Sequence, residues 1–228
     1  LAESDIDVFF WTPFNQAMRD ISASTFIRQL LIHTFNTKTL VIGDDFCFAR
    51  NREGNANTLQ RAARALGFSL AQVPGVLVDG KRVSSTAIRH ALAEGDLALA
   101  RRYLGRPYRM SGRVVSGQKL GRDLGYPTAN VNLQRRQSAV LGIFAVRVHG
   151  VGTTALSAVA SVGTRPTFSG TTPILEVHIF DFDGDLYGRY IHVDFIKRLR
   201  SEIKFDSADA LIEQMNIDSR QAREILAA

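Results

Sequence analysis

Cysteine is almost absent from this chain, because Cys47 is the only one among 228 residues. A single cysteine excludes a disulfide framework and a cysteine-built zinc site, and a reducing cytoplasm suits such a composition best. The five histidines show no spacing typical of metal ligands. Long apolar runs are missing as well: no stretch approaches the ~20 apolar residues of a membrane helix, and no secretory segment opens the sequence. We therefore expect neither a zinc site nor a membrane span.

Positive charge exceeds negative charge, although no dense basic block carries the excess. Lysine and arginine number 28 against 22 aspartate and glutamate, which gives a net charge of +6. This balance suits an anionic partner such as nucleic acid, a membrane surface or nucleotide phosphates. Hydrophobic residues make up 45% of the chain, enough to bury the core of one large or two ordinary domains. Because the sequence opens with Leu-Ala-Glu and no Met, we expect a fragment of a longer protein.

Strand and helix patterns alternate up to about Leu104. Apolar runs predict buried strands, and apolar residues at helical spacing predict helices with Ser22 or Ser24 and Ser84 to Thr86 as N-caps. The expected strands span residues 7–11 and 40–42, and the expected helices span residues 22–35, 59–66, 84–93 and 97–104. Such alternation is typical of a parallel sheet with crossover helices.

The pattern changes after Gly105-Arg106-Pro107 to short strands without intervening helices. Strand-like stretches span residues 109–116, 142–149, 156–162, 175–182 and 190–196, and two helices are expected over 208–215 and 219–226. Five or six such strands indicate a closed antiparallel barrel. We place the domain boundary near Leu104, so that residues 1–104 and 105–228 form separate domains.

The stretch LGRDLGYPTANV, residues 120–131, combines turn formers with two neutral oxygen donors. Pro127 makes the chain enter Thr128 extended, and residues i and i+2 of an extended segment point the same way. The Thr128 hydroxyl and the Asn130 amide therefore lie side by side, an arrangement that suits Mg²⁺ beside a phosphate. Upstream glycines, with Lys119 and Arg122, resemble a phosphate-cradling loop. The alternative is the polar start of a hairpin.

Residues 175–182, LEVHIFDF, predict a strand with two different faces. Leu175, Val177 and Ile179 share one face, and Glu176 and His178 share the other. A carboxylate placed there could accept a proton from an attacking hydroxyl group. The alternative is a solvated glutamate on the outer face of the barrel.

Two further segments contain residues suited to phosphate binding. Ser85 and Thr86 lie at an expected helix N-terminus, with Arg89 one turn later. Asp45 lies in GDDFCFARNREG, directly after an expected strand, where parallel sheets bind ligands. A routine helix cap and a polar surface loop are the alternatives.

The order of these motifs is more specific than any one of them. GRPYRMSGRVVSGQKLGRDLGYPTANV, GTRPTF, LEVHIFDFDGDLYG and FIKRLRSEIKF resemble the riboflavin kinase module of bacterial bifunctional FAD synthetases. GDDFCFARNREG and SSTAIR resemble the later part of the FMN adenylyltransferase domain of those enzymes. The resemblance implies an α/β plus β fold. A partial Rossmann-like nucleotidyltransferase domain, without its N-terminal strand–helix unit, would precede a six-stranded antiparallel β-barrel with C-terminal helices.

The resemblance also implies roles for individual residues. Thr128 and Asn130 would bind Mg²⁺ with the ATP phosphates, and Glu176 would take the proton from the riboflavin 5′-hydroxyl. The other implied residues are Gly117, Lys119, Gly121, Arg122 and Pro127 for ATP, Arg200 and Glu202 for the flavin, and Asp45, Ser85, Thr86 and Arg89 for the adenylyltransferase nucleotide. The implied partners are small molecules (riboflavin, FMN and ATP), with FAD as a product, rather than nucleic acid or a membrane.

The sequence departs from the family pattern at two places. Ser161 stands where the family usually has asparagine, and we expect this change to tune the activity rather than remove it. The His-x-Gly-His motif of the adenylyltransferase does not occur in the sequence. We therefore expect this chain to phosphorylate riboflavin but to make little FAD.

Two other kinds of protein fit part of the sequence. A basic β-barrel could bind nucleic acid, but Phe144, Phe180 and Phe195 stand within apolar strands, as core residues do. A flavin-binding regulator without catalytic activity would not need Thr128, Asn130 and Glu176 together.

Overall fold

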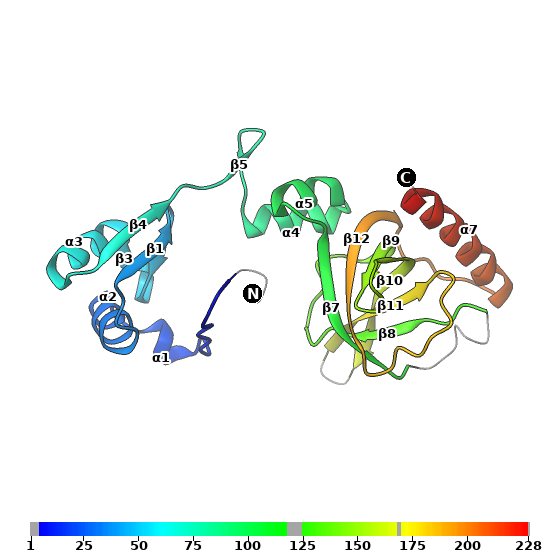
Figure 1. The fold of residues 1–228 in the computed structure, drawn as a ribbon, viewed down its shortest axis with the longest axis horizontal. Helices are drawn as coiled ribbons and strands as arrows, with labels where there is room; N and C mark the ends of the chain where they lie inside the picture. The colour runs from blue at the N-terminus through cyan, green and yellow to red at the C-terminus, as the bar shows by residue number, and fades with distance from the viewer. Residues whose placement is uncertain (1–4, 118–124, 168–169, 228) are drawn as a thin grey trace. The chain divides into compact units, whose positions relative to one another are not determined.

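The computed structural model describes residues 5–117, 125–167 and 170–227 (Figure 1). Two compact units divide the chain, one over residues 1–77 and the other over residues 78–228. Each unit has its own hydrophobic core and is described separately below.

A two-stranded parallel sheet with flanking helices forms the first unit. Strand β1 (Thr39–Gly43) pairs with β4 (Ser69–Val73) in the register Thr39 to Ser69. The other elements are α1 (Gln16–Arg19), α2 (Ala23–Thr25), η2 (Phe26–Thr34), β2 (Cys47–Phe48), η3 (Arg50–Arg52), β3 (Gly54–Asn55) and α3 (Ala56–Leu66). Ile27, Ile42 and Leu59 are among the buried residues that join the helices to one face of the sheet.

Caps fix the ends of the helices in this unit. The Ser22 side chain accepts a hydrogen bond from the backbone N–H of Thr25 at the start of α2, as predicted. Asn55 does the same for Thr58 at the start of α3. Helix α3 ends at Gly67, whose φ of +77° is the left-handed conformation that glycine adopts without strain. The predicted helix over residues 22–35 is confirmed as α2 continued by η2.

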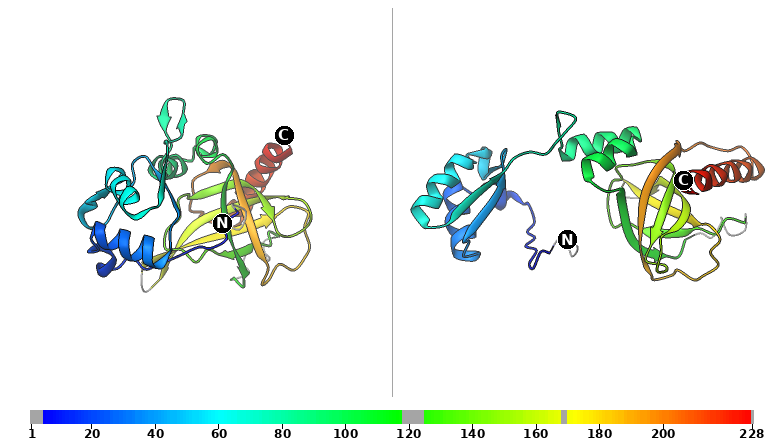
Figure 2. Two further views of the ribbon diagram at one scale, coloured as in Figure 1. Left: turned by 60° about the vertical axis from the view of Figure 1, so that its left-hand side comes forward. Right: turned by 45° about the horizontal axis from the view of Figure 1, so that its top comes forward.

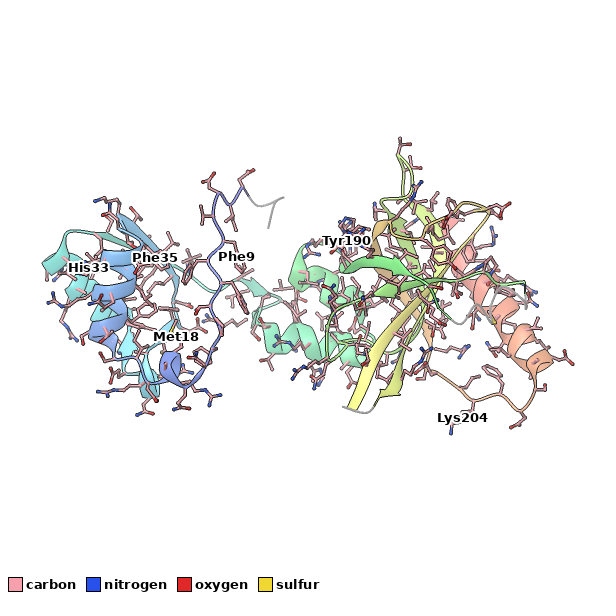
Figure 3. The ribbon with its side chains drawn as sticks, turned by 90° about the horizontal axis from the view of Figure 1, so that it is seen from below. Phe9, Met18, His33, Phe35, Tyr190 and Lys204 are labelled. Atoms are coloured by element: carbon pink, nitrogen blue, oxygen red, sulfur yellow. The ribbon has the colours of Figure 1, made fainter. Side chains whose placement is uncertain are left out.

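The predicted strand over residues 7–11 is wrong. Those residues form no strand, and Val8 and Trp11 are 82% and 73% exposed. Phe35, at the end of the helix predicted over residues 22–35, is 43% exposed and meets the Phe10 ring edge-on at 4.9 Å. Phe9, labelled with Phe35 in Figure 3, is 64% exposed. An apolar run favours extended backbone, but a strand forms only where another strand pairs with it, and in the described residues β1 and β4 pair only with each other.

The second unit begins with a hairpin and two helices. Strands β5 (Leu77–Val78) and β6 (Lys81–Arg82) are joined by Asp79 and Gly80, both at positive φ. Helices α4 (Ser85–Glu94) and α5 (Leu97–Leu104) follow, and both end at a left-handed glycine, Gly95 and Gly105. Their predicted positions are confirmed.

Six strands then close the antiparallel barrel that was predicted (Figures 1 and 2). The strands are β7 (Tyr108–Val115), β8 (Ala129–Asn132), β9 (Gly142–His149), β10 (Leu156–Thr167), β11 (Gly170–Ile179) and β12 (Tyr190–Arg200). They close in the order β10-β11-β8-β7-β12-β9. Met110, Phe144, Leu175 and Ile191 fill the barrel and are completely buried.

A single helix, α7 (Ala208–Ala227), covers the barrel at the end of the chain. Two separate helices were predicted here, and that prediction is wrong because residues 216–218 continue the helical pattern and contain neither glycine nor proline. Ala222 and Leu226 of α7 pack against Ala145 of β9 and against Phe180, which follows β11.

The domain boundary near Leu104 stays a prediction. Helices α4 and α5 contribute Ala91, Leu92, Leu97 and Ala100 to the hydrophobic cluster that fills the barrel. In the compact units, these helices therefore belong with the barrel rather than with the parallel sheet.

Candidate functional site

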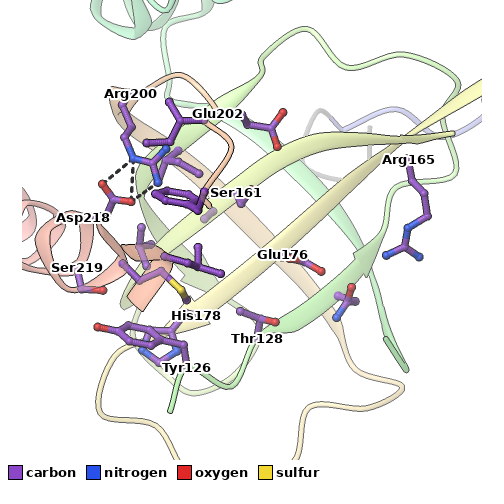
Figure 4. Close-up of a pocket in the computed structure, with 18 residues that line it drawn as sticks. Tyr126, Thr128, Ser161, Arg165, Glu176, His178, Arg200, Glu202, Asp218 and Ser219 are labelled. Atoms are coloured by element: carbon purple, nitrogen blue, oxygen red, sulfur yellow. Dashed lines mark hydrogen bonds and ion pairs between the residues drawn. The ribbon is translucent and has the colours of Figure 1, made fainter. Parts of the chain in front are cut away.

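A cavity of about 460 Å³ opens on the outside of the barrel, between its wall and α7 (Figure 4). Strands β8, β10 and β11 provide its polar wall, and α7 provides Leu211, Met215, Asp218 and Ser219. Ile203 and Phe205, from the segment between β12 and α7, complete an apolar side. The cavity therefore combines a polar wall with an apolar slot, as sites for small organic molecules usually do.

Three of the predicted site residues meet on the polar wall of this cavity. Strand register places Glu176 of β11 opposite Asn130 of β8 and, on its other side, opposite Ser161 of β10. Residues directly opposite in an antiparallel pair have Cβ atoms about 5 Å apart. Thr128, one residue before β8, lines the same cavity, and Figure 4 shows its side chain next to that of Glu176. The expected juxtaposition of Thr128, Asn130 and Glu176 is present.

The alternation of β11 explains why Glu176 reaches the cavity. Leu175, Val177 and Ile179 face the barrel interior and are at most 6% exposed, as predicted. Glu176 and His178 face outward, where α7 and the segment after β12 cover them. Glu176 is half-buried in a cavity wall, not solvated on an open face.

Gly117 lies against the amide of Asn130. A side-chain carbon at position 117 would collide with the Asn130 side chain, so only glycine permits this close approach. Pro127 borders a second cavity, described below. Lys119, Gly121 and Arg122, the other residues predicted for the nucleotide loop, lie outside the described residues.

Arg200 and Glu202, predicted to contact a flavin, both line the 460 Å³ cavity. The Arg200 guanidinium donates to the Asp218 carboxylate through Nε at 2.9 Å and through Nη2 at 2.7 Å. Asp218 is only 3% exposed and also accepts a hydrogen bond from Gln214 at 3.0 Å. This ion pair therefore joins the end of β12 to α7 directly beside the cavity.

Sequence reasoning missed Asp218 and Ser219. The Ser219 hydroxyl oxygen is buried, lines the cavity and has no hydrogen-bond partner among the described residues. Asp218 interrupts an apolar stripe at helical spacing, made of Leu211, Met215, Ala222 and Leu226. An acidic residue in such a stripe needs a buried cationic partner, and that signal could have identified it.

A second cavity of about 410 Å³ adjoins the first at Thr128. Pro127, Thr128 and Ala129 form one side, and the segment from Phe182 to Tyr187 forms the other. A smaller cavity of about 260 Å³ shares Ser161, Arg165, Glu176 and Glu202 with the first. Thr128 therefore lines both the first and the second cavity, and Glu176 lines both the first and the smaller one.

The residues predicted for adenylyl transfer line none of the three cavities above. Asp45 is exposed, in the loop after β1. Ser85, Thr86 and Arg89 are exposed in α4, whose N-cap is Ser84, accepting a hydrogen bond from the Ala87 N–H at 3.1 Å. The capping role is therefore confirmed for Ser84, and the nucleotide-binding role of the other residues stays a prediction.

Two protein-family models match different parts of the chain. The riboflavin kinase family model matches residues 104–226, and the FAD synthetase model matches residues 1–87. The bifunctional riboflavin kinase/FMN adenylyltransferase of Escherichia coli strain K12 is 45% identical over 224 residues, covering 98% of this chain and 72% of that protein. The enzyme of Haemophilus influenzae is 42% identical over 223 residues, with the same coverage of both chains.

The chain belongs to the bifunctional riboflavin kinase/FMN adenylyltransferase family. The cavity that holds Thr128, Asn130 and Glu176 lies in the part matched by the riboflavin kinase model, whereas Asp45, Ser85 and Thr86 lie in the part matched by the FAD synthetase model.

A solved structure also resembles this member of the family. A Streptococcus pneumoniae protein titled a macrolide-efflux protein has a TM-score of 0.74 and 34% identity, covering 92% of this chain and 67% of that one. Among the described residues of this chain, no helix is long and apolar enough to cross a membrane.

Proposed function

We propose that the chain transfers the terminal phosphate of ATP to the 5′-hydroxyl of riboflavin, with Mg²⁺, and so produces FMN. The observation that carries the proposal is the meeting of Thr128, Asn130 and Glu176 on one wall of a cavity. Membership of a family whose relatives are named for this activity supports the choice of substrates. The apolar slot beside the polar wall also suits the binding of a small organic molecule.

The donor atoms of this wall fit Mg²⁺. Mg²⁺ prefers oxygen ligands, retains several waters and is usually held by few protein groups together with substrate phosphates. Thr128 and Asn130 supply neutral oxygens, and Glu176, opposite Asn130, adds a carboxylate to the same wall. When bound, the ion would neutralise charge on the phosphates of ATP.

Glu176 is the proposed general base. As the riboflavin hydroxyl oxygen bonds to the terminal phosphorus of ATP, the bond to the leaving ADP breaks and the hydroxyl proton passes to the Glu176 carboxylate. Phosphoryl transfer depends mostly on positioning and charge neutralisation, so one correctly placed carboxylate suffices for the proton.

The two adjoining cavities suit two substrates. Arg200 and Glu202 line the 460 Å³ cavity, to which we assign the flavin. The 410 Å³ cavity beside Pro127 is then available to the nucleotide, with Gly117 and the predicted residues Lys119, Gly121 and Arg122 contributing to the phosphate loop. Because Thr128 borders both cavities, the phosphate would pass from one substrate to the other beside it.

Adenylylation of FMN to FAD is the second activity of the relatives by name. We assign Asp45, Ser85, Thr86 and Arg89 to that reaction in the family. The 228 residues contain no His-x-Gly-His motif, so we expect this polypeptide to make FMN and little FAD. Action in the cytoplasm, without nucleic acid or membrane partners, stays a prediction.

Nucleic-acid binding is not favoured. Phe144, Phe180 and Phe195 of the barrel unit are 0%, 6% and 2% exposed, so these three rings cannot stack on bases.

The proposal is tested by incubating the chain with riboflavin and Mg-ATP and separating the flavins by chromatography. We expect FMN to accumulate, and to stop accumulating when EDTA removes the metal. If riboflavin stays unchanged while the folded protein is present at micromolar concentration or above, the proposal is wrong.

A further inference from the structure

His178 lies on β11 two positions beyond Glu176 and therefore on the same face of the strand. Its side chain lines the 460 Å³ cavity near Tyr126 and Thr128 (Figure 4). It has no role in the proton or metal chemistry proposed above.

The His178 ring nitrogen Nδ1 lies 2.9 Å from the backbone carbonyl oxygen of Pro127. A carbonyl oxygen can only accept a hydrogen bond, so Nδ1 must carry the hydrogen and donate it. This contact assigns the tautomer of His178 with Nδ1 protonated. Pro127 has no N–H, so its carbonyl is the only hydrogen-bonding group that its backbone offers.

The contact is made where the strand pairing stops. The β8–β11 ladder pairs Val131 with Leu175, Asn130 with Glu176 and Ala129 with Val177, and then ends. Thr128 would face His178 in the next pair, but no ladder hydrogen bonds hold it. The His178 side chain therefore replaces the missing pair by anchoring the carbonyl of the peptide bond that leads into Thr128.

The ring is itself held on both sides. Its centroid lies 5.0 Å from that of Tyr126 and 5.8 Å from that of Phe180. The Tyr126 hydroxyl donates a hydrogen bond to the side-chain oxygen of Asn216 on α7. Residues 126–128 are thus fixed from β11 and from α7 together.

We propose that His178 is a positioning residue for phosphoryl transfer. By donating from Nδ1 to the Pro127 carbonyl, it fixes the Pro127–Thr128 peptide so that the Thr128 hydroxyl stays beside Asn130 in the metal-binding orientation. This inference rests on the proposed function, because the role of Thr128 does. His178 itself touches neither the metal nor the transferred phosphate.

Two substitutions separate the hydrogen bond from ring packing. His178→Phe keeps a ring between Tyr126 and Phe180 but has no donor, whereas His178→Asn places an amide N–H close to the position of Nδ1 without the ring. We expect His178→Phe to raise the Mg²⁺ concentration for half-maximal FMN formation about tenfold, and His178→Asn to raise it less than about threefold. The reverse order would assign the effect to packing and overturn the proposal.

Binding measurements give a readout that does not depend on turnover. Calorimetric titration with Mg-ADP should show about tenfold weaker binding to His178→Phe than to the parent chain, with His178→Asn close to the parent. In the parent, ¹⁵N imidazole NMR should show the hydrogen of His178 on Nδ1. A spectrum with the hydrogen on Nε2 alone would overturn the proposal even if both variants failed to fold. A parent chain that forms no FMN would instead refute the proposed function, while the NMR result would still report on the contact.

Discussion

Glu176 illustrates how single residues on one strand divide between packing and chemistry. Leu175 and Val177 on either side are 0% and 1% exposed inside the barrel, while the glutamate faces a cavity lined by other elements. The alternation of β11 could be predicted from the sequence, because side chains of a strand alternate between two faces. The covering of the outer face could not be predicted from the sequence. It is made by α7 and the segment after β12, which fold back over β11 from about 30 residues further along the chain.

Glu176→Gln should lower the turnover number for FMN formation by about 10²-fold or more, as expected for loss of a positioned general base. Glutamine keeps the size of the side chain but cannot take the proton. Steady-state kinetics with saturating riboflavin and Mg-ATP would measure the change. Glu213→Gln, an exposed glutamate of α7 outside the cavity lining, is the matched control and should leave turnover unchanged. Turnover of Glu176→Gln within about threefold of the parent would rule out the role of the base.

Asn130→Ala should raise the magnesium concentration that the reaction requires, because one of two neutral oxygen donors is lost. The effect would be measured by titrating the initial rate with Mg²⁺ at fixed ATP. Asn132→Ala is the control, since Asn132 is also in β8 but is exposed, lines none of the cavities above and accepts a hydrogen bond from the Gln134 N–H through its side chain. Identical titrations for Asn130→Ala and the parent would argue against metal ligation.

Helix α7 is the element that converts the barrel wall into a cavity. It contributes Leu211, Met215, Asp218 and Ser219 to the lining, and its Ala222 and Leu226 pack against Ala145 and Phe180 on the barrel surface. The sequence predicted two helices here, over residues 208–215 and 219–226, rather than one continuous helix. Asp218 is a buried partner of Arg200, a contact that depends on where β12 ends.

Asp218→Ala should lower the free energy of unfolding by about 3 kcal/mol, because it leaves the Arg200 guanidinium without its buried partner. The same change should raise the KM for riboflavin more than the KM for ATP, since the pair adjoins the cavity assigned to the flavin. Denaturant unfolding and steady-state kinetics provide the two measurements.

Asp181→Ala is the control for this prediction. Asp181 pairs with Arg223 of α7, but the two side chains are 76% and 50% exposed, so the pair contributes little to stability. If both substitutions destabilised the chain equally, the buried pair would not have the importance given to it here.

Asp194 of β12 joins three neighbouring strands and gives the barrel a pH dependence. Its carboxylate accepts hydrogen bonds from Arg109 of β7 at 2.5 and 2.8 Å and lies 3.1 Å from Nε2 of His149 on β9. Burial by itself would raise the pKa of Asp194, but Arg109 and His149 together outweigh it and lower that pKa below the usual value. The folded state therefore favours the ionised carboxylate.

The unfolding free energy should fall as the pH drops below about 4, the range in which an unfolded aspartate takes up a proton. A lowered pKa contributes stability that is fully present above the unfolded pKa and is lost as the pH falls through the folded pKa. Asp194→Asn should be less stable at pH 7 and should lose less on acidification. Parallel curves of unfolding free energy against pH for the two proteins would contradict the assignment.

For the whole molecule, local sequence patterns predicted where helices and strands lie better than they predicted which strands pair with each other. The barrel strands were placed from turns and alternation, yet β8, only the stretch Ala129–Asn132, became evident from its pairing with β7 and β11. The apolar run at residues 7–11 failed as a strand for the same reason, because pairing depends on residues distant in sequence. The same holds for the site. Thr128, Asn130 and Glu176 could be chosen from local patterns. The Arg200–Asp218 pair and the His178 contact could not, because they depend on the closed barrel.

The most direct test of the central claim is transfer of label from [γ-³²P]ATP to riboflavin by the 228-residue chain in the presence of Mg²⁺, with a parallel reaction of FMN and [α-³²P]ATP, because FAD keeps only the α-phosphate of ATP. The account predicts labelled FMN from riboflavin and, from FMN, little FAD by comparison. Absence of labelled FMN from a folded preparation would contradict the account.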